Sequence, residues 1–563
     1  MSSVRETEID GVLCFFVDTG RPLSSAHLIF RQGTADEPLH ETGWLHLLEH
    51  LALLDRETLS RPVSGSTGML LTAFETNGSA EAVAQRLGAL AAWLAEPDLR
   101  LLARERGVLQ AEAQLRADPL VRSLTWRYGA VGPGVASYVE AGSVRATPEL
   151  LVERSRHVFN SSNAVLVLDG PPPAGLSLPL APGEYHPPTP AQPVGRPLPA
   201  AYLDDAGLTL SGAVPRTHEA TFLPALLERA VHDGLRQRTG GVYAPWSGIV
   251  TVDDHRAVVA AGSDVVPEML GTIVEAGFDI CRGLATEGVP RPWLDEAVAT
   301  RLQALARPEA AFAIALGAAY AVLSDRVPKT QDELVEELRT TDPQQVDVVA
   351  RAFYDSLLLG APEGAELGGR VGLVTFPEVE PTPEASRHRH VNWPADLTTF
   401  AADAESIESA TTHTARRLQI TDVVGLLAWR DGTRRAVGRD GSTIEMEPQQ
   451  WSRGQELTAV LDAAVPAELH LPMPDRAVTF QRMGAAEIVT VAFARAANTT
   501  RGLAVMLGLS LLLVLLGLLG GHRVVASVFV VVALALGMQL WLTEGGSLRI
   551  PWPKPRNEPS HAR

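Results

Sequence analysis

The pattern of apolar and polar positions predicts a repeating order of strands and helices. An apolar strand at 28–30 leads into a polar loop containing Gly33, and a helix begins near Thr42. A second strand (69–74) and a second helix (80–94) follow. From about residue 201 the same order returns: strand, helix, strands, helices and strand. We therefore expect an α+β fold with two similar α+β domains.

Proline-rich stretches and turn signals divide the rest of the chain. Near the C-terminus, short apolar runs separated by Asp-Gly turns predict a small β-rich domain, with a helix over 455–464. We expect a first domain at 1–172 and a second at 201–377, joined by a linker at 173–200. A second linker at 378–410 leads to the β-rich domain at 411–490. Two apolar spans at 502–543 and a tail at 544–563 follow.

Two uncharged apolar runs, 502–521 and 524–543, each have the length of a membrane-spanning helix. Only His522 and Arg523 separate them, so they predict a two-pass hairpin whose flanks lie on one side of the bilayer. The arginines and lysine of the tail favour the cytoplasmic side for those flanks. The N-terminal segment carries acidic residues and no apolar run of the kind found in a signal peptide. We expect a protein of the cell membrane whose large domains and tail face the cytoplasm.

Composition narrows the classes of function. The net charge of −18 argues against a nucleic acid partner. The 2 cysteines, Cys14 and Cys281, lie far apart and form no disulfide framework, which suits a reducing compartment.

The helix that begins near Thr42 carries the most informative chemistry. His46-Leu47-Leu48-Glu49-His50 reads H-x-x-E-H. Residues four apart share a helix face, so His46 and His50 can offer ring nitrogens to one metal ion. Glu49 lies on the same face and can act as a general base. Zinc lowers the pKa of its water ligand to about 7, so this pattern predicts zinc-dependent hydrolysis at neutral pH.

The surroundings of this motif resemble a known family. A strand, then Gly33-Thr34-Ala35-Asp36-Glu37, then a glycine and H-x-x-E-H is similar to the pitrilysin, insulin-degrading enzyme and mitochondrial processing peptidase family of inverted zincins. That family takes its third zinc ligand from a helix reading E-R-x-V-[IL]-x-x-E, matched here by 105–112. The resemblance implies that Glu112 is the third ligand and that Glu105 is a second important carboxylate. The segment after His50 is shorter than is usual in the family.

The second domain also matches a family pattern. Residues 235–243 fit the form L-R-x-x-x-G-x-x-Y, which implies that Arg236 and Tyr243 contact the substrate backbone and the developing oxyanion. In the family these two residues face a zinc across a closed chamber, often from a partner subunit. We therefore expect a homodimer, or a heterodimer with a related chain. A helix end capped by Gly240 explains the same residues without a functional role.

The resemblance implies a zinc endopeptidase that cleaves short or unfolded peptides, with the peptide added as a strand at a sheet edge. No second H-x-x-E-H occurs in the second domain, so one Zn²⁺ per chain is expected. Two alternatives stay open: a non-catalytic scaffold of the same family, and an accessory protein for export whose function lies in the membrane.

Overall fold

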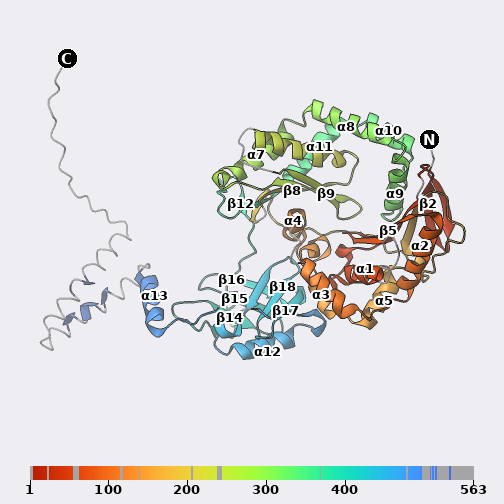
Figure 1. Cartoon of the computed structure of the whole chain (residues 1–563). Helices are drawn as coiled ribbons and strands as arrows, with labels where there is room; N and C mark the ends of the chain where they lie inside the picture. Colours follow the sequence, from red (N-terminus) through yellow and green to blue (C-terminus); the bar gives the residue numbers. More distant parts are fainter. Residues whose placement is uncertain are drawn as a thin grey trace, which may run out of the picture.

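The structure is a computed structural model of the chain, shown in Figure 1. It describes residues 4–497 except for 22–23, 55–62, 114–117, 139, 205–206, 238–243, 368, 384 and 477–479. Scattered residues between 507 and 533 are also described.

A first unit is built on a six-stranded sheet with the order β1-β2-β6-β3-β5-β4. β2 and β6 run parallel, and all other neighbours run antiparallel. Because successive side chains of a strand point to opposite faces, the sheet has two apolar faces. The strands are β1 (Arg5–Ile9), β2 (Val12–Val17), β3 (Ser24–Arg31), β4 (Ser64–Thr67), β5 (Leu71–Gly78) and β6 (Ala164–Asp169).

Four helices of the first unit share a core with one face of this sheet. Apolar residues of β3 and β5, among them Leu28, Phe30 and Phe74, are fully buried beneath them. The helices are α1 (Trp44–Leu54), α2 (Ala80–Ala95), α3 (Leu102–Ala113) and α5 (Pro148–Val158).

A second unit repeats this plan. Its sheet has the order β12-β7-β11-β8-β10-β9. The places that β2, β3, β4, β5 and β6 have in the first sheet are taken here by β7, β8, β9, β10 and β11. Only the outermost partner differs, because β1 is antiparallel to β2 whereas β12 is parallel to β7. The strands are β7 (Ala200–Leu203), β8 (Leu208–Pro215), β9 (Trp246–Thr251), β10 (Arg256–Ser263), β11 (Leu358–Ala361) and β12 (Gly372–Leu373).

Helices again cover one face of this second sheet and share its core. By their place in the chain, α6 corresponds to α1, and α8 corresponds to α3. The helices are α6 (Leu223–Val231), α7 (Ile273–Thr286), α8 (Arg291–Leu305), α10 (Gln331–Arg339) and α11 (Pro343–Asp355).

The other face of each sheet is covered by a helix from the opposite unit. Alanines of α9 (Ala310–Val322) share a core with the second face of the first sheet, and Figure 1 shows α9 beside β2 and β5. In return, α4 (Pro119–Tyr128) binds the second sheet, where Arg127 donates to the carbonyls of Ser211 (3.1 Å) and Ser356 (2.9 Å). Neither unit therefore buries its second face by itself.

The proline-rich connector runs over both units. Residues 173–199 contain no helix or strand, yet Leu178 belongs to the core of the first unit. The backbone N–H of Ala191 donates to Asp253 of the second unit at 3.0 Å. This segment is therefore part of the packed structure.

A small third unit contains two four-stranded sheets and α12 (Gly454–Ala464) around one core. The segment 378–410, expected to be a connector, holds three of its strands, so that expectation was wrong. The strands are β13 (His388–Arg389), β14 (Thr399–Ala402), β15 (Ser406–Ala410), β16 (Ala415–Gln419), β17 (Val423–Ala428), β18 (Arg434–Gly438), β19 (Thr443–Met446) and β20 (His470–Pro472).

The third unit docks on the first. Arg145 donates to the carbonyls of Ala467 (2.9 Å) and His470 (3.0 Å). Leu39 packs so closely against Gly425 that a side chain at that glycine would overlap it. The contact therefore involves the loop before α1 and the loop before α5.

A last described helix, α13 (Ala485–Ala497), follows the third unit. The predicted hairpin at 502–543 lies outside the described residues except for a few isolated positions, and the tail at 544–563 lies wholly outside them. Within the described part of the chain no single helix has both the length and the apolarity of a membrane span. The consecutive helices α8 and α9, bent by 103°, meet those criteria only as a pair.

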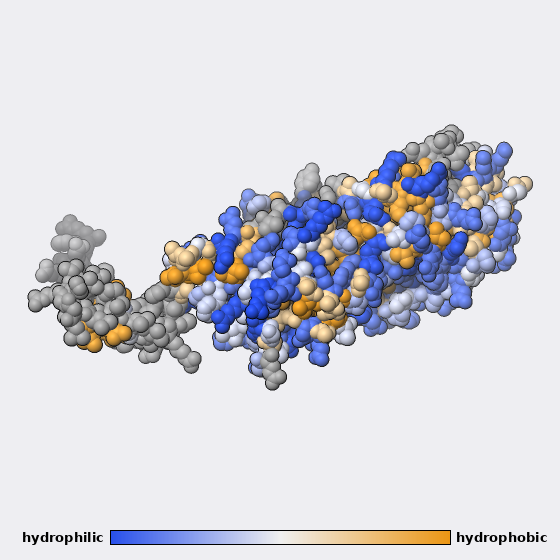
Figure 2. Space-filling model, turned by 90° about the horizontal axis from the view of Figure 1, so that it is seen from below, coloured by the Kyte–Doolittle hydropathy of each residue, from blue (hydrophilic) through white to orange (hydrophobic). Residues whose placement is uncertain are grey.

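Figure 2 shows the molecule from below. Hydrophilic residues make up most of this face, and the apolar residues form separate groups among them. This agrees with a chain whose apolar side chains are largely used in the cores of the three units.

Candidate metal centre

Helix α1 begins at a buried carboxylate. The backbone N–H groups of Gly43 and Leu45 donate to Glu37 at 2.9 and 2.8 Å, which satisfies donors that a helix start leaves unpaired. Burial raises the pKa of Glu37 to about 8, although these two N–H groups oppose the shift. Gly43 has a φ of +88°, a conformation that glycine adopts without strain. This cap fixes the position of the helix start.

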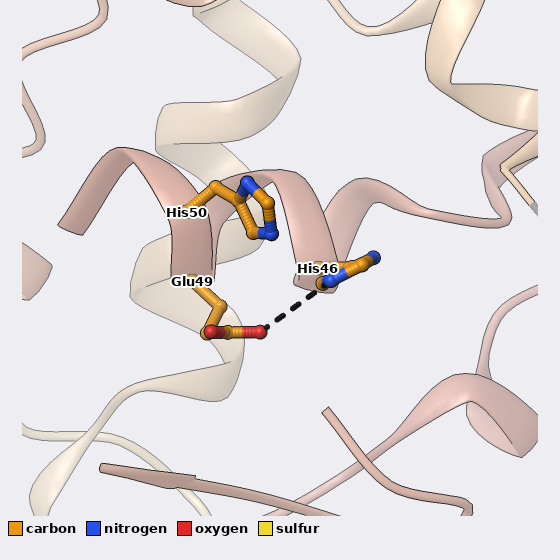
Figure 3. A group of neighbouring side chains, drawn as sticks. All are labelled: His46, Glu49 and His50. Carbon is orange, nitrogen blue, oxygen red and sulfur yellow. Dashed lines mark ion pairs between the residues drawn. The ribbon is translucent and has the colours of Figure 1, made fainter. Parts of the chain in front are cut away.

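His46, Glu49 and His50 gather on one side of α1, as Figure 3 shows. One potential ligand atom of each lies within 4.8 Å of the others. The Nε2 atom of His46 is 3.8 Å from Oε2 of Glu49. The side chains of His46, Glu49 and His50 are 7%, 6% and 17% exposed. Among the described residues this is the one such group of three His, Cys, Asp or Glu side chains.

Helix α3 places both predicted glutamates beside His50. Oε2 of Glu105 lies 3.5 Å from Nδ1 of His50, and Oε2 of Glu112 lies 3.8 Å from its Nε2. Glu105 is buried, whereas Glu112 is 38% exposed. The short segment after His50 therefore does not keep α3 away from α1.

A fourth carboxylate was not predicted from the sequence. Oε1 of Glu140 lies 2.6 Å from Nδ1 of His46, and both side chains are 7% exposed. Each histidine thus has one ring nitrogen next to a buried carboxylate and the other directed at the cluster. Glu140 lies 94 residues from His46, and no spacing or motif marks it.

The edge strand β4 runs close to Glu49. A Cβ atom on Gly65 would lie 2.5 Å from Oε1 of Glu49, so a larger residue there would displace the Glu49 side chain. The hydroxyl of Thr67 donates to Oε2 of Glu49 at 3.4 Å. Because β4 is the last strand of the sheet, Glu49 lies against an edge strand.

The donor set fits a divalent metal ion with nitrogen and oxygen ligands. Two imidazoles meet four carboxylates, and buried carboxylates are costly unless a positive charge or hydrogen bonds balance them. Oε1 of Glu105 and Oε2 of Glu140 are buried without a hydrogen-bond partner. His46, Glu49 and His50 lie close enough together to hold such an ion, and Glu112 lies beside His50.

The structure does not describe the side chains of the two predicted oxyanion residues. Tyr243 lies outside the described residues. Arg236 is described by its backbone alone, in the π-helical segment His232–Gln237 that follows α6. Their roles therefore stay predictions.

Helix α6 of the second unit carries a related sequence without the ligands. It reads Ala225-Leu226-Leu227-Glu228-Arg229 where α1 reads H-L-L-E-H. Glu228 accepts a hydrogen bond from Ser247 of β9 at 2.7 Å, much as Glu49 accepts one from β4. Arg229, in the place of His50, pairs with Glu296 of α8 at 2.6 Å. The second unit thus has a glutamate at the same place, with Ala225 and Arg229 where α1 has its two histidines.

No protein-family model matches this chain, and no curated protein matches it. Solved structures do. A protease from Helicobacter pylori matches with a TM-score of 0.53 at 13% identity, over 64% of this chain and 100% of that chain. The peptidase M16 inactive domain from Pseudomonas fluorescens matches at 0.51 and 15% identity, over 66% and 98%.

A chain of complex III2 from Candida albicans, with Inz-5 bound, matches at 0.52 and 15% identity, over 64% of this chain and 96% of that one. At these identities the likeness is one of fold alone. The chain therefore has a mixed helix and sheet fold resembling M16 peptidase domains, a fold that includes inactive members.

Proposed function

We propose that this chain is a zinc-dependent endopeptidase that hydrolyses short or unfolded peptides. The observation that carries the proposal is the cluster on α1, with His46 and His50 beside Glu49 and within reach of Glu112 on α3. Pure packing would not collect these polar groups in a helix that is otherwise apolar. The likeness of the fold to M16 peptidase domains supports the same reading.

The residues divide into ligands and a base. His46, His50 and Glu112 would hold zinc, which when bound polarises a carbonyl and lowers the pKa of water. Glu49 would take a proton from the attacking water and return it to the leaving amine. Its burial beside β4 keeps bulk solvent away from that carboxylate.

The substrate would bind as an extra strand along β4. Peptide groups of an edge strand offer hydrogen bonds to an extended chain. A peptide paired there would pass Glu49, because Gly65 of β4 lies against that side chain. Only extended segments can pair in this way, which favours unfolded peptides over folded proteins.

The remaining parts of the proposal concern partner subunits and the location of the protein in the cell. Arg236 and Tyr243 of a second copy, or of a related chain, would complete the site by stabilising the oxyanion. The apolar runs at 502–543 would anchor the chain in the cell membrane as two passes, with the large units in the cytoplasm.

The decisive experiment compares two equivalent glutamates. Glu49→Gln is expected to lower cleavage of an unstructured peptide by about 10²- to 10⁴-fold, because the general base is lost, while zinc stays bound. Glu228→Gln, the matched change in α6, is expected to leave cleavage within twofold of the parent. Cleavage retained in Glu49→Gln would contradict the proposed mechanism.

A non-catalytic scaffold is the second candidate. The match to an inactive M16 domain favours it, since the same fold serves without catalysis there. Zinc content separates the two, because a scaffold has no need of a stoichiometric metal. The full chain is expected to carry one zinc if it is the enzyme.

A further inference from the structure

We infer that Glu140 is a positioning residue for His46 in the proposed metal centre. The inference rests on the proposed zinc site and adds a role that no sequence motif assigns. His50 has Glu105 behind it, and His46 has Glu140 behind it. The distance from Nδ1 of His46 to Glu140 is 2.6 Å, shorter than the 3.5 Å from Nδ1 of His50 to Glu105.

The contact determines which ring nitrogen is free for a metal. A carboxylate at hydrogen-bond distance from Nδ1 favours the tautomer that carries its proton there. Nε2 of His46 is then unprotonated, and it is this atom that faces Glu49 and the cluster. Such carboxylate–histidine pairs also fix the ring orientation and raise the basicity of the ligand.

The backbone at Glu140 supports a functional reason for the contact. Its φ of +58° and ψ of 13° lie in the left-handed region, which is unfavourable for a residue with a side chain. The carbonyl of Glu140 accepts from Ser143, at 3.0 Å from the backbone N–H and 2.7 Å from the hydroxyl. A glycine would suit this conformation better, yet only a side chain can reach His46.

The structure also makes room for the carboxylate. Oε2 of Glu140 lies where a Cβ atom on Gly43 would be, only 2.0 Å away. The absence of a side chain at Gly43 therefore admits Glu140 to the start of α1. A buried oxygen with no hydrogen-bond partner lies against this helix start as a result.

The Glu140 loop is tied to both helices that carry the proposed ligands. Thr42 accepts from the N–H of Gly142 at 3.0 Å, and Trp44 donates to the carbonyl of Gly142 at 3.0 Å. Arg106 of α3 donates to the carbonyl of Ser143 at 2.9 Å. These hydrogen bonds hold the loop that carries the carboxylate against the start of α1 and against α3.

The test measures zinc affinity of the full chain by competition with a chromophoric chelator. Glu140→Ala is expected to raise the zinc Kd by about 10- to 100-fold, the range for loss of such a partner. Glu140→Gln is expected to fall between Ala and the parent, since its amide oxygen can still accept the Nδ1 proton. Glu153→Gln, which removes an exposed glutamate on α5, is the matched control and should leave the Kd unchanged.

Glu140→Gly separates positioning from a structural role. It relieves the left-handed backbone, so the melting temperature of the metal-free chain should hold or rise while the zinc Kd rises as in Glu140→Ala. A fall in that melting temperature with unchanged Kd would overturn the inference. So would a Kd for Glu140→Ala within twofold of the parent.

These outcomes are distinct from failure of the proposed function. A parent chain that binds zinc but cleaves no peptide contradicts the endopeptidase and leaves the Glu140 measurement intact. A parent chain that binds no zinc overturns the metal centre and the role of Glu140 together.

Discussion

Helices α1 and α6 occupy equivalent places in two units with the same strand order, yet only α1 carries a candidate metal centre. Both helices read L-L-E at their middle, and both glutamates accept a hydrogen bond from a hydroxyl on the edge strand. The difference lies on either side of that glutamate. Two histidines flank it in α1, and Ala225 and Arg229 flank it in α6.

The two helices also differ in how deeply these positions are buried and in which groups face them. His46 and Glu49 are buried, whereas Ala225 and Arg229 are exposed. Carboxylates of α3 and of the Glu140 loop face the histidines of α1, while α6 meets α8 through an ordinary surface ion pair. In this shared scaffold the candidate metal centre thus occurs on the helix whose histidines also face carboxylates from neighbouring segments.

Among the further predictions, the largest effect is expected on the pH dependence of stability, and it arises at the start of α1. Its cap, Glu37, has a pKa of about 8 against an ordinary value of 4.5, whereas α6 begins without a side-chain cap. Between those pH values the folded chain holds a proton that the unfolded chain has lost. Stability should therefore fall as pH rises from about 5 to 8, by up to about 1.4 kcal/mol per pH unit.

Urea midpoints at pH 5.5, 6.5 and 7.5 check this slope. Glu37→Gln should flatten it, since the amide does not titrate, although Arg154 and Glu140 also face this carboxylate. Glu219→Gln, just before α6, is the matched control, because α6 begins without a side-chain cap. Equal slopes in Glu37→Gln and the parent would show that the cap does not titrate in this range.

A smaller effect is expected when the motif is rebuilt in α6. Ala225→His with Arg229→His restores H-L-L-E-H on the equivalent helix. We expect tight zinc to remain at one per chain, because both positions in α6 are exposed to solvent. Metal analysis of the dialysed double variant measures this, and a second tightly held zinc would mean that the motif alone is sufficient.

The local part of the site could be predicted from the sequence. Residues four apart lie on one helix face whatever the tertiary fold, so His46 and His50 were expected together, and they are found together. Glu105 and Glu112 were assigned through the resemblance, and the structure places both beside His50. Glu140 could not be found, because its contact joins residues 94 apart and its backbone conformation leaves no trace in a hydrophobic pattern.

The fold, like the site, could be predicted from the sequence only in part. The order of strands and helices and its repeat follow from apolar periodicity, and the two sheets bear out that repeat. The exchange of α4 and α9 was not predicted, since an apolar face does not indicate which sheet it will cover. The strand at 406–410 was missed because a charged residue is buried in it: Glu408 pairs with Arg387 and Arg417, and a buried charge breaks the apolar alternation.

The central claim is that the cluster on α1 is a metal centre, and zinc analysis of the purified full chain tests it most directly. We predict about one zinc per chain in the parent and less than a tenth of that after His46→Ala with His50→Ala. Circular dichroism should show that the double variant remains folded. A parent without zinc, or a double variant that retains it, would contradict the account.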